Sequence, residues 1–270
     1  MTEKEYRQSE GISRSELWLL NPDNGGTPEK FKWAREHPQP ATQALIFGQA
    51  VHKLLLEPDS FDNEFVVAPE GLNRTAVKGW EKFCKDFPTM TAISLKEFNK
   101  AREMVSKALS YKDVRDLLKG QHEKPIFWTD EQTGIKCKCR TDNLHDEPKV
   151  VDYKTTRNAS TRFFSSAIYR YGYNFQAGMY CEGVMKHLGL NELPPFTIIA
   201  QETEPPYAVN RITLPQPVII DGNDSFHETL GIYKDCIETG YWYGYNGAFD
   251  VENEAQIPGW MQIGTEDDED

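Results

Sequence analysis

Two aspartates and a lysine lie close together near the middle of the chain, in the stretch TDNLHDEPKVVDYKTT at 141–156. Asp152 and Lys154 are two residues apart on a predicted strand, so their side chains point to the same face. Asp142 ends the preceding predicted strand, and the turn between the strands brings both carboxylates toward one end of a hairpin. Because converging carboxylates repel each other, the arrangement needs a compensating cation. A divalent metal such as Mg²⁺, which prefers oxygen ligands, meets that need.

Phosphodiester hydrolysis is the reaction that such a set of groups performs. A bound metal lowers the pKa of its water, and the ammonium of Lys154 orients that water or stabilises charge on a phosphate oxygen. An Asp-x-Lys pattern is also frequent on exposed strands, where it carries no chemistry. The three residues predict a metal-dependent hydrolase only if further groups join them.

Three residues on predicted helices are candidates to join the site. Gln176 and Tyr180 are four residues apart, so they share a helix face and can both reach it. The alternative is a half-buried tyrosine beside a solvated glutamine. His52 lies on an apolar stripe, where an imidazole needs a partner. It is either a core histidine bonded to a backbone carbonyl or a metal ligand.

The elements that must position these residues change type near residue 118. Apolar residues at helical spacing and two N-cap signals, Ser13 and the pair Ser94 and Glu97, predict a mainly helical front part. Alternating apolar and polar residues then predict three strands joined by short turns. The predicted helices are 15–20, 41–57, 94–110, 161–171, 173–189 and 221–242, and the predicted strands are 123–130, 134–142, 149–155, 195–204 and 207–214. This order predicts an α/β (α+β) fold, with a sheet flanked by helices.

The chain shows no internal repeat and no low-complexity linker. We therefore expect one domain over 1–262, in which 1–118 is the helical front part and 119–245 is the sheet-containing core. The acidic stretch 263–270 is predicted to be a disordered tail. The polar amino terminus has no apolar signal segment and no apolar run is long enough to span a membrane, so we expect a soluble, cytoplasmic protein.

Charge and cysteine content exclude several classes of protein. A formal net charge of −12 argues against a protein that coats nucleic acid nonspecifically. The segment 153–170 is a local exception, with four basic residues and no acidic one. Five cysteines without an export signal predict reduced, buried thiols rather than a disulfide framework. No P-loop motif occurs, so we expect no use of ATP.

The combined motifs resemble the RecB-like branch of the PD-(D/E)xK nucleases. They are G-x-x-x-H-x-L-L-L-E-P at 48–58, D-x9-D-x-K at 142–154 and Q-x-x-x-Y at 176–180. The likeness is closest to the exonuclease VIII (RecE) family of phage and prophage recombination exonucleases. It rests further on KCKCRTD followed by VVDYKTT, and on the SRSEL start before an Asn-Pro turn. It covers roughly residues 10 to 240.

The resemblance implies a fold and roles for the candidate residues. The fold is a central mixed β-sheet with a restriction-endonuclease-like core. His52, Asp142, Asp152 and the backbone carbonyl of Tyr153 would hold metal ions, which we expect to be two Mg²⁺, with Mn²⁺ as the alternative. Lys154 would position the attacking water. Gln176 and Tyr180 would support the site and contact DNA, and Glu123 is a possible additional acid or a surface residue. An iron–sulfur cluster is not expected, because Cys236 is the only cysteine after Cys181.

The resemblance also implies a substrate and partners. Family members degrade linear double-stranded DNA from 5′ ends and leave 3′ single strands for a strand-annealing protein. They are ring-shaped homo-oligomers, which implies a trimer or tetramer here, in a bacterial host cell that carries the phage or prophage. We expect Arg157, Ser160, Thr161 and Arg162 to hold backbone phosphates. Arg14 is a candidate to bind an end phosphate.

Two other functions remain open at this stage. A RecB-like nuclease of the adaptation or repair type would use the same metal site on single strands or flaps. A catalytically silent DNA-binding protein would keep only the fold. Against the silent protein, a site without chemistry has no reason to keep two repelling carboxylates beside a lysine. A sugar or phosphate-ester hydrolase lacks support, because nothing resembles a sugar-binding platform.

Overall fold

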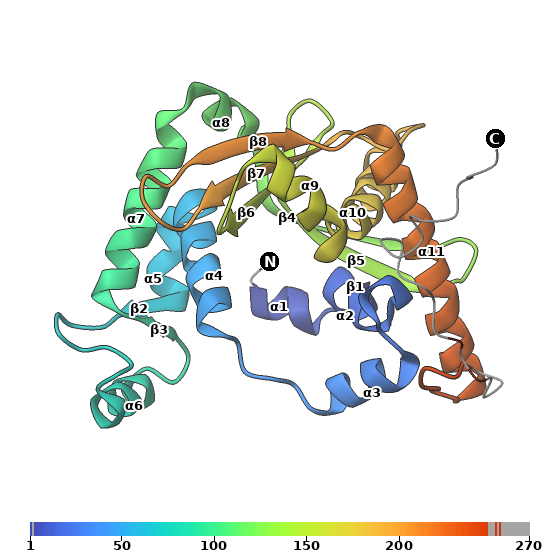
Figure 1. Cartoon of the computed structure of the whole chain (residues 1–270), viewed down its shortest axis with the longest axis horizontal. Coiled ribbons are helices and arrows are strands. Elements are labelled where there is room, and N and C mark those ends of the chain that lie inside the picture. Colours follow the sequence, from blue (N-terminus) through green and yellow to red (C-terminus); the bar gives the residue numbers. More distant parts are fainter. Residues whose placement is uncertain (2, 248–251, 253, 255–270) are drawn as a thin grey trace, which may run out of the picture.

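A six-stranded mixed sheet forms the centre of the computed structural model (Figure 1). The structure describes residues 1, 3–247, 252 and 254, so the predicted acidic tail at 263–270 and the predicted domain end at 262 lie outside the described residues. The strands of the sheet are β1 (Ile12–Ser13), β4 (Gly120–Thr129), β5 (Lys136–His145), β6 (Val150–Thr156), β7 (Phe196–Glu202) and β8 (Val209–Thr213). The strand order is β1-β5-β6-β7-β8, and β4 also pairs with β5.

The pairing directions confirm the predicted meander and the mixed sheet. Strand β5 pairs antiparallel with both β4 and β6. Strand β7 then runs parallel to β6, and β8 returns antiparallel. The connection from β6 to the parallel strand β7 contains two helices, α9 (Thr161–Arg170) and α10 (Tyr173–Leu188). Parallel neighbours need such a crossover. The predicted fold class is therefore confirmed.

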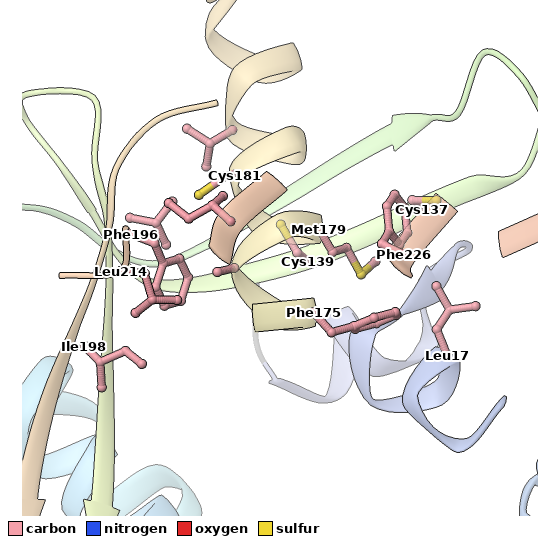
Figure 2. Close-up of a cluster of buried hydrophobic side chains, with 14 of the residues drawn as sticks. Leu17, Cys137, Cys139, Phe175, Met179, Cys181, Phe196, Ile198, Leu214 and Phe226 are labelled. Atoms are coloured by element: carbon pink, nitrogen blue, oxygen red, sulfur yellow. The ribbon is translucent and has the colours of Figure 1, made fainter. Parts of the chain in front are cut away.

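The largest apolar core packs α10 and α11 (Gln216–Thr239) against one face of the sheet. Figure 2 shows this cluster, in which Phe175, Met179 and Phe226 lie together on the helices and Ile198 of β7 lies on the side of Phe196 and Leu214. Cys137, Cys139 and Cys181 lie in it, and Cys236 is also buried, while Cys84 is partly exposed. All five cysteines are free. Burial raises the pKa of the Cys137 thiol to about 12. The predicted burial is confirmed for four of the five cysteines.

A second core covers the other face of the sheet. Helices α4 (Gln43–Leu56), α7 (Leu95–Ser110) and α8 (Lys112–Leu117) contribute Val51, Met104 and Val114, respectively, to it. Val151 and Tyr153 of β6 belong to this core, whereas Val150 belongs to the first. This division is the alternation of side chains expected along a strand. Among the described residues, no helix has both the length and the apolar character that crossing a membrane requires.

Capping residues mark the start of three helices in the front part, and two of these caps were predicted from the sequence. Ser13 and Glu16 form a capping box at the start of α2 (Arg14–Leu20), and Ser94 and Glu97 form another at α7. Thr42 accepts a hydrogen bond from the Leu45 N–H and caps α4. These bonds satisfy backbone donors that a helix start leaves unpaired. They fix where α4, which carries His52, begins.

The front part also contains strands that the sequence pattern did not predict. They are β1, at two residues, and the parallel pair β2 (Phe65–Val67) and β3 (Thr91–Ile93). Strands of two or three residues are too short to show an alternating pattern. The remaining helices here are α1 (Glu3–Gln8), α3 (Pro28–Glu36), α5 (Phe61–Glu64) and α6 (Val77–Asp86), with 3₁₀ turns at Pro22–Asn24 and Pro58–Ser60.

Two glycines allow α10 and α11 to approach each other closely. A Cβ atom on Gly178 would lie 2.1 Å from the backbone nitrogen of Asn223, and one on Gly222 would lie 1.9 Å from the carbonyl oxygen of Asn174. No side chain fits at either contact. The close approach fixes the position of α10, and with it Gln176.

A buried ion-pair network ties the same two helices to β4. Glu182 on α10 accepts hydrogen bonds from His227 and Asn223 on α11, and its other oxygen lies 3.1 Å from Lys186. His227 Nδ1 lies 3.6 Å from Asp130, which follows β4. Burial alone raises the pKa of Glu182, but these donors outweigh it and lower the pKa to about 2. The pKa of His227 is raised, chiefly by its bond to Glu182.

Candidate active site

The two predicted aspartates stand where β5 and β6 separate. The strands pair only at Leu144 with Val150 and at Asn143 with Val151. Asp142 and Asp152 occupy the next positions of this register, where the ladder has ended. The backbone N–H of Tyr153 instead donates to Asp142 Oδ2, at 2.7 Å. Strand β5 continues to His145, so the expectation that Asp142 ends its strand was wrong by three residues.

His52 on α4 joins Asp142 at this opening. Its Nε2 atom lies 3.0 Å from Asp142 Oδ2 and 3.0 Å from the carbonyl oxygen of Tyr153. His52 therefore contacts a backbone carbonyl, as one of its two interpretations expects, and it also contacts a carboxylate. Three atoms that can bind a metal thus converge from α4, β5 and β6.

Glu123 on β4 completes this group. Its Oε1 atom lies 3.4 Å from His52 Nδ1, and its Oε2 atom lies 2.8 Å from Arg140 Nε. Glu123 has φ 49°, in the left-handed region that residues with a Cβ rarely adopt. The β4–β5 ladder skips the Glu123–Asp142 position, although the residues on either side pair. Strained backbone of this kind concentrates at functional sites, so Glu123 is a more prominent candidate than its sequence position suggests.

Asp152, Lys154 and Gln176 form a second group beside the first. Lys154 Nζ lies 2.9 Å from both oxygens of Asp152. Gln176 Nε2 on α10 donates to Asp152 Oδ1 at 2.6 Å. Asp152 is 1% exposed, and its Oδ2 atom accepts no hydrogen bond from the described residues. Lys154 also lies over the ring of Tyr173, 5.3 Å from its centroid.

The two aspartates have opposite electrostatic environments. Burial, together with a smaller contribution from Asp142, raises the pKa of Asp152 to about 6, although Lys154 opposes the rise. Burial also acts to raise the pKa of Asp142, but His52, Lys154 and the Tyr153 N–H outweigh it, so that pKa is lowered. For Lys154, the attraction of both aspartates overcomes burial and raises its pKa. The site therefore keeps Asp142 ionised and Lys154 charged, and it destabilises the ionised form of Asp152.

An open cleft of about 910 Å³ gives access to these groups. Its lining includes His52, Glu123, Asp142, Lys154, Gln176 and Tyr180. Tyr180 is one helical turn after Gln176, and burial raises the pKa of its phenol well above the ordinary value. The tyrosine and the glutamine thus share one helix face and reach the same cleft, as the sequence spacing predicted.

Arg14 also lines the cleft, at the start of α2. Its guanidinium donates to the carbonyl oxygens of Tyr171 and Gly172 and lies over the Trp18 ring. Its Nε atom is buried and has no hydrogen-bond partner among the described residues. Burial lowers its pKa, against the attraction of Tyr180 and Asp152. A buried guanidinium with a spare donor favours an anion in the cleft.

The other predicted DNA contacts lie outside the lining of this cleft. Arg157, Ser160 and Arg162 are exposed in the segment that leads from β6 into α9. The Thr161 hydroxyl accepts a hydrogen bond from Asn210. These residues follow Lys154 along the chain and do not surround the converging carboxylates.

Sequence reasoning missed the basic side of the cleft, although a signal was present. Lys138, Arg140 and Asp142 alternate with Cys137 and Cys139 along β5, so they share a face. Lys138 Nζ donates to backbone oxygens at the end of α1, including that of Ser9 at 2.6 Å, and so anchors the amino-terminal segment. Arg140 pairs with Glu123 instead. In the sequence, the stretch KCKCRTD supported the family resemblance, but no role was given to Lys138 or Arg140.

The donor set at His52 fits a divalent metal ion. Neighbouring ligands of an octahedral ion with bonds of about 2.1 Å lie about 3.0 Å apart, which is the separation of His52 Nε2 from its two oxygen neighbours. Glu123 beside Nδ1 is placed as a carboxylate that fixes the tautomer of a ligating histidine. His52, Glu123 and Asp142 offer one ligand atom each within 4.8 Å, and Asp152 is outside that group. His52, Asp142 and the Tyr153 carbonyl are therefore the groups that would hold an ion.

A family model matches most of this chain. The family is described as a PDDEXK-like domain of unknown function (DUF3799), and its model matches residues 27–255. The chain belongs to this family. The match includes the residues that converge at the site from β4, β5, β6, α4 and α10. The DUF3799 description agrees with the PD-(D/E)xK motif and with the mixed sheet.

One solved structure agrees with this fold. A candidate exonuclease from Eubacterium rectale is 14% identical to the chain, with a TM-score of 0.63 over 98% of each chain. At that identity the likeness shows the fold alone. A second structure, named SSO0001, is 12% identical to the chain, over 89% of this chain and 78% of its own. Its TM-score of 0.36 is too low to support a conclusion about the fold. None of the curated proteins matches the chain significantly.

Proposed function

We propose that this DUF3799 protein is a metal-dependent exonuclease that hydrolyses phosphodiester bonds of linear double-stranded DNA from 5′ ends. The observation that carries the proposal is the convergence of His52 Nε2, Asp142 Oδ2 and the Tyr153 carbonyl oxygen within hydrogen-bonding distance, beside a buried Asp152–Lys154 pair. A divalent ion held there supplies Lewis-acid chemistry, because it neutralises phosphate charge and makes water more acidic. Mg²⁺ is the expected ion, Mn²⁺ is the alternative, and a second ion would use Asp152.

The protein's own groups prepare the remaining parts of the reaction. Lys154 has a raised pKa, so it stays an ammonium and acts as a fixed positive charge rather than as a proton acceptor. Asp152 holds Lys154 through an ion pair and a hydrogen bond to its Oδ1 atom, and Gln176 holds Asp152. This chain of contacts points the ammonium to where charge develops on a phosphate oxygen or where the attacking water sits. Such preorganised charge is a major source of catalysis.

The direction of cutting and the partners belong to the same proposal. The motif resemblance supports 5′-to-3′ degradation, which leaves 3′ single strands for an annealing protein. Arg14 supports an end phosphate in the cleft, because its positively charged side chain lines the cleft. We further propose a ring-shaped trimer or tetramer, which encloses the DNA, in the cytoplasm of a bacterium that carries a phage or prophage.

A side-by-side cleavage assay tests the proposal. Linear duplex labelled at the 5′ or 3′ end, nicked circle and single strand are incubated with Mg²⁺, with and without EDTA. We expect early release of the 5′ label from linear duplex, little cutting of the circle, and no cutting with EDTA. Asp142→Asn and Lys154→Met should lose activity, whereas Asp146→Asn, an exposed acid on the next turn, should keep it.

Other results of the same assay would overturn the proposal. Preferred cutting of single strands or flaps would assign the adaptation or repair role. Binding of duplex without cleavage under every metal condition would indicate a silent DNA-binding protein. Early release of the 3′ label would reverse the proposed polarity.

A further inference from the structure

Three aromatic rings are exposed within nine residues at and after α9. They are Phe163, Tyr169 and Tyr171, which are 39%, 54% and 49% exposed, and together they are called the aromatic strip below. α9 lies between β7 and α10 in Figure 1. Tyr169 and Tyr171 lie at the carboxyl end of α9, and Phe163 lies nearly two helical turns earlier. Single exposed apolar residues are ordinary on a protein surface, but three exposed rings on so short a segment need an explanation.

The aromatic strip is continuous with the candidate active site. The Lys154 ammonium lies over the Tyr173 ring, and the Tyr173 ring lies 5.8 Å from the Tyr171 ring, centroid to centroid. Phe164 stacks on Tyr173 at 5.7 Å, from the core. A row of rings therefore leads from the residue that would act on the scissile phosphate to the exposed end of α9.

The backbone that carries the rings is held in place before any ligand arrives. Phe164, Ala167 and Ile168 bury the inner face of α9. At its start, Asn210 donates to the carbonyl oxygen of Ala159. At its end, Arg14 donates to the Tyr171 and Gly172 carbonyls. Gly172 has φ 62°, and a Cβ there would lie 2.4 Å from the Trp18 ring, so the turn that presents Tyr171 tolerates no side chain.

Positive charge accompanies the rings. From Tyr153 to Cys181 the chain carries Lys154, Arg157, Arg162 and Arg170 and no acidic residue. Arg162 and Arg170 are exposed on α9 together with Phe163 and Tyr169. Exposed rings interleaved with cations are the combination that binds single-stranded nucleic acid, in which bases stack on the rings and cations contact the backbone.

We propose that the aromatic strip binds unpaired DNA bases next to the scissile phosphate by stacking. Away from its ends, a duplex exposes only the edges of its bases, so rings that lie along a strand find no stacking partner there until the strands separate. The inference rests on the proposed nuclease function and adds a substrate requirement to it. The strand must be unpaired where it leaves the metal site, and the strip holds it open.

Binding of a short single strand, measured without cleavage, tests the inference. Fluorescein-labelled (dT)12 is titrated with the full chain in EDTA, and fluorescence anisotropy gives Kd. The double variant Tyr169→Ala, Tyr171→Ala should weaken binding at least about tenfold. The ring-preserving Tyr169→Phe, Tyr171→Phe should bind like the wild type, and the apolar Tyr169→Leu, Tyr171→Leu should bind like the alanine variant. Tyr111→Ala, a ring 40% exposed beside α8, is the matched control and should have no effect.

Two further readouts separate stacking from other roles. The alanine variant should keep the wild-type salt dependence of Kd, because its phosphate contacts remain, whereas Arg162→Ala, Arg170→Ala should flatten it. An oligonucleotide with 2-aminopurine near its end should lose fluorescence on binding to the wild type and not on binding to the alanine variant.

Two outcomes would overturn the inference. Equal Kd values for the wild type and the alanine variant would show that the aromatic strip does not bind DNA. Wild-type binding by the leucine variant, with a smaller assembly of the alanine variant in light scattering, would make the strip a contact between subunits. In either case, Mg²⁺-dependent cutting of DNA by the wild type would leave the proposed function standing, whereas its absence on every substrate would refute that function separately.

Discussion

Replacing Asp152 with asparagine should inactivate the protein and stabilise its metal-free fold. Burial raises the pKa of this carboxyl from 3.8 to about 6. An acid whose pKa is higher in the folded state favours folding while it is protonated. As pH rises through 3.8 toward 6 the acid ionises, and this contribution to the free energy of unfolding is lost. At 1.36 kcal/mol per pKa unit, ionised Asp152 costs the fold about 3 kcal/mol at pH 7.5 and about half of that at pH 5. Asparagine removes this cost and keeps the shape.

Asp142 is the matched control, and its expected effect has the opposite sign. His52, Lys154 and the Tyr153 N–H lower its pKa in spite of burial. An acid with a lowered folded pKa stabilises the fold above its ordinary value, and that contribution is lost only as pH falls below 3.8. Asp142→Asn should therefore destabilise the protein at pH 7.5.

Urea unfolding in EDTA at pH 5 and pH 7.5 measures both effects. The stability gained by Asp152→Asn should be larger at pH 7.5, and added Mn²⁺ should stabilise the wild type more than this variant. If Asp152→Asn were instead less stable than the wild type at pH 7.5, the Asp152–Lys154 pair would be a structural ion pair. The argument that the fold holds a strained carboxylate for a cation would then fail.

Three further predictions concern the supports of the site. Glu123→Gln should weaken Mn²⁺ binding about 10- to 100-fold in calorimetry, because the carboxylate orients His52, and an unchanged affinity would contradict that role. Gly178→Ala should lower the free energy of unfolding by about 1–3 kcal/mol, because the added Cβ has no room against α11. The control Gly231→Ala, which meets nothing within 4 Å, should not destabilise the protein. His227→Gln should lower the free energy of unfolding by about 1–3 kcal/mol at pH 6, because the ion pair with Glu182 is lost. Because the folded pKa of His227 is raised, this advantage of the wild type should be lost as pH rises above 6.5, and a constant difference from pH 6 to pH 9 would refute the ion pair.

The elements that carry the site were predictable from the sequence because each has a strong local signal. Ser94 and Glu97 start α7, and alternation in the three central strands predicts the meander. The spacing of Gln176 and Tyr180 places both on one face of α10. These signals depend only on neighbours in the sequence, so no tertiary contact was needed to interpret them.

The arrangement of charges at the site could not be predicted from the sequence, because it depends on details of the backbone conformation. The sequence shows that Asp142 and Asp152 approach each other, but not that β5 and β6 separate there. It does not show that Glu123 adopts φ 49° and turns toward His52. The opposite pKa shifts of the two aspartates arise from partners on other elements, and no pattern within 141–156 encodes them.

The location of a bound Mn²⁺ ion tests the central claim most directly. Anomalous diffraction from crystals soaked in Mn²⁺ should show a peak bonded to His52 Nε2, Asp142 Oδ2 and the carbonyl oxygen of Tyr153, and Asp142→Asn should remove it. No peak at this position, with His52 still bonded to Asp142 and Tyr153 at saturating Mn²⁺, would contradict the account.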